Sequence, residues 1–144
     1  MKIEDIMTRD VRGCMADDSL ATAAQIMWEN DCGSVPVTDA DGRVMGIITD
    51  RDLAMAAHLQ GVALRASRVS SAMARDVKCC SPRDTPATVQ AIMQQHKIRR
   101  VPVVDDQKRL LGIVSLGDLA RETDAAPAQK ALEGVSAPGG QHQQ

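Results

Sequence analysis

The chain repeats itself. When the sequence is shifted by 66 residues, residues 3–54 align with residues 69–120 without a gap, and 20 of these 52 positions are identical. At ordinary composition, chance gives about three or four identities over such a length. The 144 residues therefore carry one small structural unit twice, and the same elements are expected in each copy. The identical runs include Arg9-Asp10-Val11, Val35-Pro36-Val37 and Asp52-Leu53-Ala54, each with its counterpart 66 residues later.

Each copy carries signals for strand, helix, strand, strand and helix. Short apolar segments predict the first strands, at Val11–Met15 and Val77–Ser81. Asp18-Ser19 and Asp84-Thr85 are typical helix caps. The apolar residues after each cap are spaced i, i+3 and i+4, as on one face of a helix. These faces comprise Ala23, Ile26 and Met27 in one copy and Val89, Ile92 and Met93 in the other.

A hairpin and a second helix complete each copy. Its strands are predicted at Ser34–Asp39 and Val44–Thr49 in the first copy, and at Arg100–Asp105 and Leu110–Ser115 in the second. The turns between them are polar, as at Asp41-Gly42. The second helix is predicted to begin at Thr49 or Ser115.

The predicted fold class is α+β, with two β-α-β-β-α repeats. Repeat 1 covers residues 1–60, residues 61–68 form a connector, and repeat 2 covers residues 69–122. Residues 123–144 are rich in Ala, Pro, Gly, Gln and Ser, which predicts a flexible tail.

The two repeats are expected to pack against each other. One copy of this size is marginal alone, so we expect a face-to-face pair with a pseudo-twofold axis. Pro36 and Pro102 stand inside predicted strands, where a missing N–H is tolerated only at an edge or a bulge. Each copy is therefore expected to place an exposed, interrupted strand edge at this point, and the two edges would line a cleft between the repeats.

Composition argues against several classes of protein. No apolar run approaches the ~18 residues of a membrane span. The start, Met1-Lys2-Ile3-Glu4-Asp5, has acidic residues where a signal peptide would become apolar, so a cytoplasmic location is predicted. One Trp, no Tyr or Phe and a net charge of −2 argue against nucleic-acid binding. The charge is −6 over residues 1–60 and +4 over residues 61–124. The second half could thus receive a small anion, or the opposite charges could help two copies pair.

The cysteines and histidines show neither a metal-binding nor a catalytic pattern. There is no CxxC pair and no ligand spacing of histidines, so reduced thiols are expected and a metal site is not. Cys14 and Cys80 are expected to pack as small hydrophobic strand residues. His96 falls on the predicted apolar helix face and is expected to pack there, whereas His58 lies near a helix end. No nucleophile stands beside a base, so the chain is not predicted to be an enzyme.

One short motif ends the hairpin in both copies. Gly46-Ile47-Ile48-Thr49-Asp50-Arg51-Asp52 is matched by Gly112-Ile113-Val114-Ser115-Leu116-Gly117-Asp118. One interpretation is a helix-capping box, with Asp in place of the usual Glu. The other is a ligand site, because a helix N-terminus and a hydroxyl suit a phosphate and a carboxylate can accept two hydrogen bonds from a ribose diol. The presence of the motif at the same place in both copies strengthens the second interpretation.

The sequence resembles a tandem pair of CBS (cystathionine-β-synthase-type) domains over residues 1 to about 122. The resemblance rests on this motif, on the Val-Pro-Val strands and on the segments around Met7 and Met73. The sequence is also similar to short bacterial CBS-only proteins of the hypoxic-response type. The resemblance implies no cofactor. It implies an adenosine-type ligand (AMP, ADP, ATP or S-adenosylmethionine) in the cleft between the repeats.

The resemblance also implies roles for particular residues. Thr49 and Ser115 would contact phosphate or sugar, and Asp52 and Asp118 would hold the ribose hydroxyls. Arg99 and Arg100 would reach phosphates, with a solvated strand start as the alternative. The adenine would lie near Val11 and Val77.

The copies differ where a phosphate would bind. The first has Gly33-Ser34 where the second has Arg99-Arg100. Asp50 in the first copy would repel a phosphate unless Arg51 offsets it, so unequal sites are predicted. The sequence, together with the resemblance, predicts a cytoplasmic, non-catalytic sensor that passes a ligand-driven change in packing to a protein target. The resemblance also implies a homodimer. The alternatives are a ligand-free dimeric interaction module, a redox sensor that uses Cys14, Cys32, Cys79 or Cys80, and an enzyme acting on a nucleotide.

Overall fold

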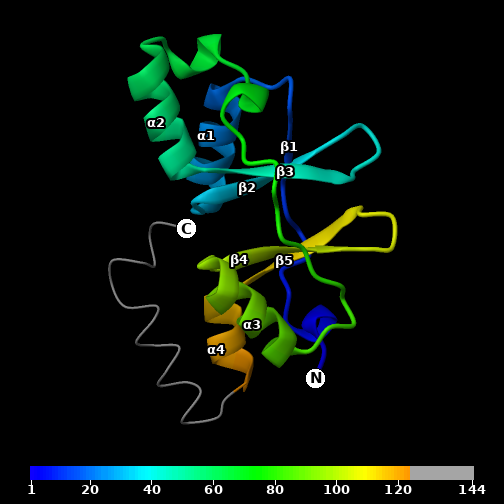
Figure 1. The fold of residues 1–144 in the computed structure, drawn as a ribbon. Helices are drawn as coiled ribbons and strands as arrows, with labels where there is room; N and C mark the ends of the chain where they lie inside the picture. Colours follow the sequence, from blue (N-terminus) through cyan, green and yellow to red (C-terminus); the bar gives the residue numbers. More distant parts are fainter. Residues whose placement is uncertain (124–144) are drawn as a thin grey trace. The chain divides into compact units, whose positions relative to one another are not determined.

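The computed structural model of the chain describes residues 1–123 (Figure 1). The predicted flexible tail, residues 123–144, lies outside the described residues except for Thr123, which ends the last helix. The elements are η1 (Ile3–Asp5), β1 (Cys14–Met15), α1 (Leu20–Asn30), β2 (Ser34–Thr38), β3 (Val44–Thr49), α2 (Asp50–Gln60), η2 (Leu64–Ala66), η3 (Val69–Ser71), α3 (Pro86–His96), β4 (Arg100–Val104), β5 (Leu110–Ser115) and α4 (Leu116–Thr123).

Contacts divide the described chain into two compact units that do not follow the order of the repeats. The first-repeat unit holds residues 12–77, and the second-repeat unit holds residues 1–11 and 78–123. The opening segment of each repeat therefore lies in the unit built around the other repeat. Residues 1–11 belong to the second-repeat unit, and residues 69–77 belong to the first-repeat unit.

Each exchanged segment is fixed by a pair of backbone hydrogen bonds to the last strand of the hairpin. In the second-repeat unit, Thr8 and Ile113 exchange N–H···O bonds of 2.9 Å in both directions. In the first-repeat unit, Ile47 and Ala74 do the same, again at 2.9 Å. Such close approach requires the motif glycines: a Cβ at Gly46 or Gly112 would lie 2.6 Å from the carbonyl oxygen of Ala74 or Thr8, respectively.

The first-repeat unit is a small sheet covered by two helices. β2 is the middle strand, parallel to β1 and antiparallel to β3. Helices α1 and α2 pack against this sheet and against each other (Figure 1). Ser19 caps α1 as predicted, since its side chain accepts a hydrogen bond from the N–H of Thr22. The predicted apolar face of α1 is buried, and Val69 and Met73 of the exchanged segment complete the core.

The second-repeat unit repeats this plan with one strand fewer. β4 and β5 form an antiparallel hairpin, and α3 and α4 lie together. Thr85 caps α3 as predicted, and Pro86 occupies its first turn, where a missing N–H carries no cost. Ile3 and Ile6 of the exchanged segment join the core with Val89 and Met93.

The first strands are shorter than the sequence predicts. β1 holds only Cys14–Met15 of the predicted Val11–Met15, and in the second copy Cys80 forms a single bridge to Val103. The cause is the proline in the neighbouring strand. Because proline has no N–H, pairing begins at its carbonyl: the N–H of Cys80 donates to Pro102 O at 3.0 Å, and the N–H of Val104 donates to Cys80 O at 2.9 Å.

Two expectations about exposure are wrong. Pro36 and Pro102 are buried, so the interrupted strand edges are not exposed. Pro36 stands in the middle strand of its sheet, and Cys80 bridges to Val103 beside Pro102, so neither proline lies on an open edge. His96 is exposed and does not pack on the apolar face of α3, because it is the last residue of that helix and lies one turn beyond the buried Met93.

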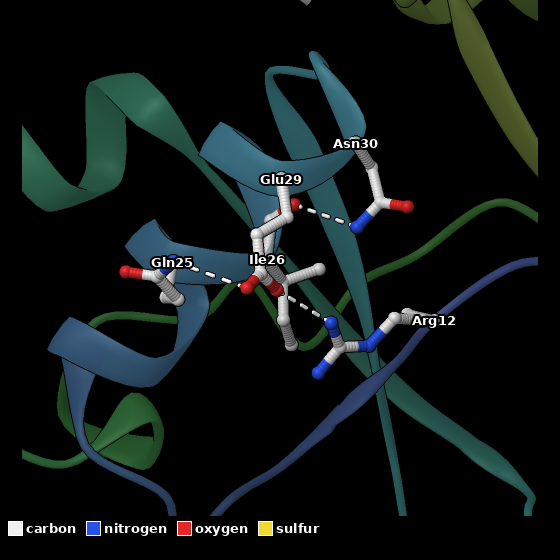
Figure 2. Close-up of polar contacts among 5 residues, drawn as sticks. All are labelled: Arg12, Gln25, Ile26, Glu29 and Asn30. Atoms are coloured by element: carbon white, nitrogen blue, oxygen red, sulfur yellow. Dashed lines mark hydrogen bonds and ion pairs between the residues drawn. The ribbon is translucent and has the colours of Figure 1, made fainter.

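Arg12 ties the segment before β1 to α1 (Figure 2). Its Nη1 donates to Oε1 of Glu29 at 2.7 Å, and Nε2 of Gln25 donates to Oε2 of the same carboxylate at 3.1 Å. Asn30 closes the helix end by donating from Nδ2 to the carbonyl oxygen of Ile26 at 2.8 Å. Hydrogen bonds from Gln25 and then from Arg12 lower the pKa of Glu29.

Candidate functional site

The first motif lies where β3 ends and α2 begins. The N–H of Thr49 donates to Oδ2 of Asp52 at 2.9 Å, and Oγ1 of Thr49 accepts from the N–H of Asp52 at 3.1 Å. The N–H of Asp50 donates to the carbonyl oxygen of Gly33 at 2.9 Å. Ser34 faces Thr49 directly across the ladder. The start of α2 is therefore held against the start of β2.

The second motif has the same construction where β5 ends and α4 begins. The N–H of Ser115 donates to Oδ2 of Asp118 at 2.9 Å, and Oγ of Ser115 accepts from the N–H of Asp118 at 3.1 Å. The N–H of Leu116 donates to the carbonyl oxygen of Arg99 at 2.8 Å. Arg100 faces Ser115 across the ladder. The structure thus brings together four of the predicted residues at this point.

The capping-box interpretation of the motif is confirmed in both units. The cap uses the hydroxyl oxygen as an acceptor and one carboxylate oxygen, Oδ2. It leaves the hydroxyl hydrogen and Oδ1 available to a further partner. The cap therefore orients the two predicted ligand groups at the helix start, and the ligand-site interpretation remains compatible with it.

The arginines before and at the start of β4 carry unsatisfied donors. Nη1 of Arg99 and Nε of Arg100 are buried, and neither has a hydrogen-bond partner among the described residues. A buried donor without a partner costs about 1–3 kcal/mol, and more when it is charged. The sequence left open that Arg99 and Arg100 are simply solvated at the start of the strand, but Nη1 of Arg99 and Nε of Arg100 are not exposed to solvent. In the first copy, Oγ of Ser34 is likewise buried without a partner.

Val11 and Val77 lie apart from the strands predicted to contain them. Both are half-buried and neither belongs to a strand. Val11 ends the exchanged segment of the second-repeat unit, and Val77 ends that of the first-repeat unit. Each valine therefore shares a unit with the motif of the other repeat: Val11 with Ser115 and Asp118, and Val77 with Thr49 and Asp52.

Arg121 is a residue at this site that the sequence reasoning missed. Its guanidinium Nη2 donates to Oδ1 of Asp118, which occupies the second oxygen of that carboxylate. No such bond to Oδ1 of Asp52 is formed by the described residues. The signal was available, because Arg121 lies three residues after Asp118 on one helix face, whereas its counterpart in the repeat is Met55.

The four cysteines are free thiols. Cys14 and Cys80 are buried, as predicted. Burial raises the pKa of Cys14 from 9.0 to about 11 and that of Cys80 from 9.0 to about 12, and burial also raises the pKa of Cys79. Sensor thiols are accessible and have a low pKa, so these three cysteines lack the properties of redox sensors.

Metal ligands do not gather in residues 1–123, where no group of three or more His, Cys, Asp or Glu side chains could hold an ion. Within the same residues, no helix combines the length and the apolar character that crossing a membrane requires.

Comparison with known proteins identifies the family. The family model of the CBS domain matches residues 3–59 and again residues 69–124. The chain belongs to the CBS-domain family. The two matches correspond to the two copies of the internal repeat, and the α+β fold is that of solved CBS domain pairs.

Several small relatives match this CBS pair over most of its length. Hypoxic response protein 1 of Mycobacterium tuberculosis is 35% identical over 120 residues, which cover 81% of this chain and 81% of that protein. Its structure, solved with two coordinated zinc ions, gives a TM-score of 0.77 at 30% identity and covers 85% of this chain and 98% of that chain. A Burkholderia ambifaria structure assigned to signal transduction gives 0.76 at 28% identity, covering 86% and 94%.

One solved CBS pair holds adenosine-type ligands. The pair of protein MJ0100, in complex with 5′-methylthioadenosine and S-adenosylmethionine, gives a TM-score of 0.75 at 29% identity and covers 84% of this chain and 98% of that chain. Three relatives that carry enzyme names are matched over only 23%, 26% and 23% of their own length. These enzymes are therefore matched only through part of their length, whereas the neighbour from Burkholderia ambifaria, assigned to signal transduction, is matched over 94% of its chain.

Proposed function

We propose that this CBS pair is a non-catalytic sensor that binds an adenosine-type ligand (AMP, ADP, ATP or S-adenosylmethionine) at the starts of α2 and α4. The observation that carries the proposal is the pair of buried, unpartnered guanidinium nitrogens of Arg99 and Arg100 beside the capped start of α4. Buried charged donors of this kind are normally satisfied, and an anionic ligand supplies the missing acceptors. The ligands of MJ0100 support the adenosine class.

Each predicted residue has a role in this proposal. Thr49 and Ser115 donate their hydroxyl hydrogens to phosphate or sugar oxygens. Asp52 accepts from ribose hydroxyls through Oδ1, and Asp118 does so only where the sugar displaces Arg121 from its Oδ1. Arg99 and Arg100 bind phosphate oxygens. Val11 and Val77 offer half-buried apolar contact to the adenine. Binding would stabilise one arrangement of the chain over another, and the difference in ligand affinity between arrangements sets the size of the response.

The proposal is tested by titrating the full chain with AMP, ATP and S-adenosylmethionine in a calorimeter. At least one of them is expected to bind, and Arg100→Gln is expected to weaken binding of the phosphate-bearing ligands about tenfold, as for the loss of one charge-assisted hydrogen bond. Arg83→Gln is the matched control, because Arg83 is an exposed arginine of the same unit. No heat from any ligand at millimolar concentration would contradict the proposal.

A second candidate function, a homodimeric interaction module, is favoured by an apolar surface on the helices of the first-repeat unit. Trp28 of α1 is 84% exposed and Leu59 of α2 is 74% exposed, and Met55 lies one turn before Leu59 on the same face of α2. Large apolar side chains exposed on helices can mark an interface. We propose that a second copy of the chain covers them.

Light scattering tests the dimer. A molar mass twice that of the 15.4 kDa chain is expected, with dissociation in Trp28→Ser/Leu59→Ser. Trp28 is the only tryptophan, so its fluorescence reports directly on whether this surface is covered.

The four free thiols agree with a cytoplasmic location, which we propose because thiols stay reduced in that compartment.

A further inference from the structure

Arg121 changes the chemistry of the second motif. Its guanidinium bonds Oδ1 of Asp118, the oxygen that the capping box leaves over. A Cβ on Gly117 would lie 3.4 Å from Nη1 of Arg121 and 3.7 Å from Oγ of Ser115. The guanidinium therefore folds back toward Gly117 in the first turn of α4. The Arg121 side chain is 69% exposed, so it is accessible to a ligand.

The two motifs consequently differ in charge. Around the start of α4 stand Arg99, Arg100 and Arg121, with Asp118 as the one carboxylate of the motif. At the start of α2 stand Asp50 and Asp52, with Arg51 as the one cation of the motif. The capping geometry is the same in both, within the distances given above. The local charge is therefore positive at one motif and negative at the other, on the same backbone frame.

The carboxylates also differ in what they can accept. Asp118 is buried, and both of its oxygens already have partners: the Ser115 N–H and Arg121. A ribose diol would have to displace Arg121 in order to reach it. Asp52 is half-buried, and its Oδ1 has no partner among the described residues. A diol can therefore bind Asp52 without breaking an existing bond.

We infer that the two motifs have different ligand chemistry. The start of α4 is an anion subsite for phosphate oxygens, in which Arg121 is a specificity-determining residue together with Arg99 and Arg100. The start of α2 is a subsite for an uncharged ribose diol. This inference deepens the proposed function and rests on it for the diol, whereas the anion subsite can be tested without any nucleoside.

The reciprocal exchange Arg121→Met and Met55→Arg gives each motif the residue of the other. Binding of pyrophosphate, ATP and adenosine to the full chain is measured by calorimetry, with Arg83→Gln as the control for general loss of positive charge. Arg121→Met is expected to weaken pyrophosphate and ATP about tenfold and to leave adenosine unchanged or tighter, because Oδ1 of Asp118 is released. Met55→Arg is expected to weaken adenosine, because the new guanidinium stands three residues after Asp52. Light scattering checks that this variant keeps the molar mass of wild type, because Met55 also lies on the proposed dimer surface.

The outcomes separate this inference from the proposed function. If adenosine and ATP bind equally well and Arg121→Met changes pyrophosphate no more than Arg83→Gln does, the division of chemistry is wrong although the adenosine function stands. If pyrophosphate binding depends on Arg121 and neither adenosine nor ATP binds, the anion subsite stands and the adenosine function is wrong. If none of the three ligands binds the wild-type chain, both are wrong. Arg121→Gln repeats the test with a polar side chain and excludes an effect of the new methionine.

Discussion

The starts of α2 and α4 have the same hydrogen-bond geometry, which we call the frame, and they differ in the side chains beside it. Each has the reciprocal cap of a hydroxyl and an aspartate, and each receives an exchanged segment through two backbone hydrogen bonds. Even the hairpin turns match, with Oδ1 of Asp39 accepting from Asp41 and Arg43 as Oδ1 of Asp105 accepts from Gln107 and Arg109. Every hydrogen bond of this frame is donated by a backbone N–H, to a side-chain oxygen in the caps and turns and to a carbonyl oxygen in the exchanged segments. Both copies need these bonds in order to fold.

The differences lie at positions that the frame does not use. Ser34 corresponds to Arg100, Asp50 to Leu116, and Met55 to Arg121. None of these side chains takes part in the cap or in the exchanged hydrogen bonds. Duplication thus supplied two equal frames, and changes at a few positions beside them could give each its own charge without loss of the fold.

The largest expected effect tests whether the close approach of the exchanged segment contributes equally to stability in the two units. Gly46→Ala and Gly112→Ala each place a Cβ 2.6 Å from a backbone carbonyl oxygen, so the exchanged segment must move. Each is expected to lower the free energy of unfolding by about 3 kcal/mol, at the upper end of overpacking effects. Urea denaturation measures this loss. The two losses should agree within error if the frames are equivalent.

Gly117→Ala is the matched control for these two variants. Its Cβ would meet only the end of the Arg121 side chain, at 3.4 Å, and Ser115 Oγ, at 3.7 Å. Because alanine is the better helix residue, a change between zero and about 1 kcal/mol in favour of folding is expected. A loss as large as that of Gly112→Ala would show that the close approach of Thr8 is not what makes Gly112 necessary.

Burial of one cysteine in each copy predicts a second effect, at high pH. The pKa of Cys14 is raised to about 11 and that of Cys80 to about 12, chiefly by burial. Both thiols are protonated below pH 9 in the folded and unfolded chain, so their contribution is then complete. Above pH 9 the unfolded thiols ionise first, so stability falls as pH rises through the folded pKa values, and the fall is larger for Cys80 than for Cys14.

Cys14→Ala and Cys80→Ala separate the two thiols. Each variant should be less stable than wild type at pH 7, and each should lose less stability than wild type between pH 9 and pH 11. Chemical denaturation over this pH range makes the measurement. Because Cys80 has the higher pKa, its variant should remove the part of the loss that extends furthest into alkaline pH. An unchanged pH profile in both variants would contradict burial as the source.

The capping hydroxyls predict a third effect of about 1 kcal/mol. Thr49→Ala and Ser115→Ala each remove an acceptor for the N–H of the motif aspartate. Equal losses in thermal or urea unfolding are expected if capping alone decides stability. A larger loss for Ser115→Ala would show that the arginines around α4 depend on the hydroxyl for their placement. The shared frame and the side chains that differ beside it would then not be independent.

Local signals explain which parts of this structure the sequence could predict. The caps at Ser19 and Thr85 and the last hairpin strands, Val44–Thr49 and Leu110–Ser115, were predicted to the residue. They depend on neighbours within a few positions, on turn residues and on alternating burial. The motif aspartates were placed correctly for the same reason, because a capping box is complete within four residues.

Long-range pairing explains what the sequence did not reveal. The exchange of residues 1–11 and 69–77 between the units leaves no local signal, because the two segments are similar and either could pair with either hairpin. The shortness of β1 depends on a proline in a neighbouring strand, and the burial of Pro36 depends on packing from outside the strand. Arg121 was missed because it lies outside the motif and differs from its repeat counterpart, Met55, and its bond to Asp118 is what gives it a role.

The smallest expected effect concerns the carboxylate that anchors the segment before β1 (Figure 2). The pKa of Glu29 is lowered first by the hydrogen bond from Gln25 and then by that from Arg12. A lowered folded pKa stabilises the fold above the unfolded pKa, near 4.5, and this contribution is lost as pH falls through the folded value. The group is fully exposed, so a small change in stability is expected, and NMR titration of the carboxyl carbon is the suitable measurement. Gln25→Ala and Arg12→Ala should each raise the pKa of Glu29, because each removes one of the two hydrogen bonds to its carboxylate. The second copy has Gln95 at this position and cannot show the effect, so an acid-induced loosening confined to the first-repeat unit is expected. An unchanged pKa of Glu29 in both variants would contradict these hydrogen bonds as the cause of the lowered pKa.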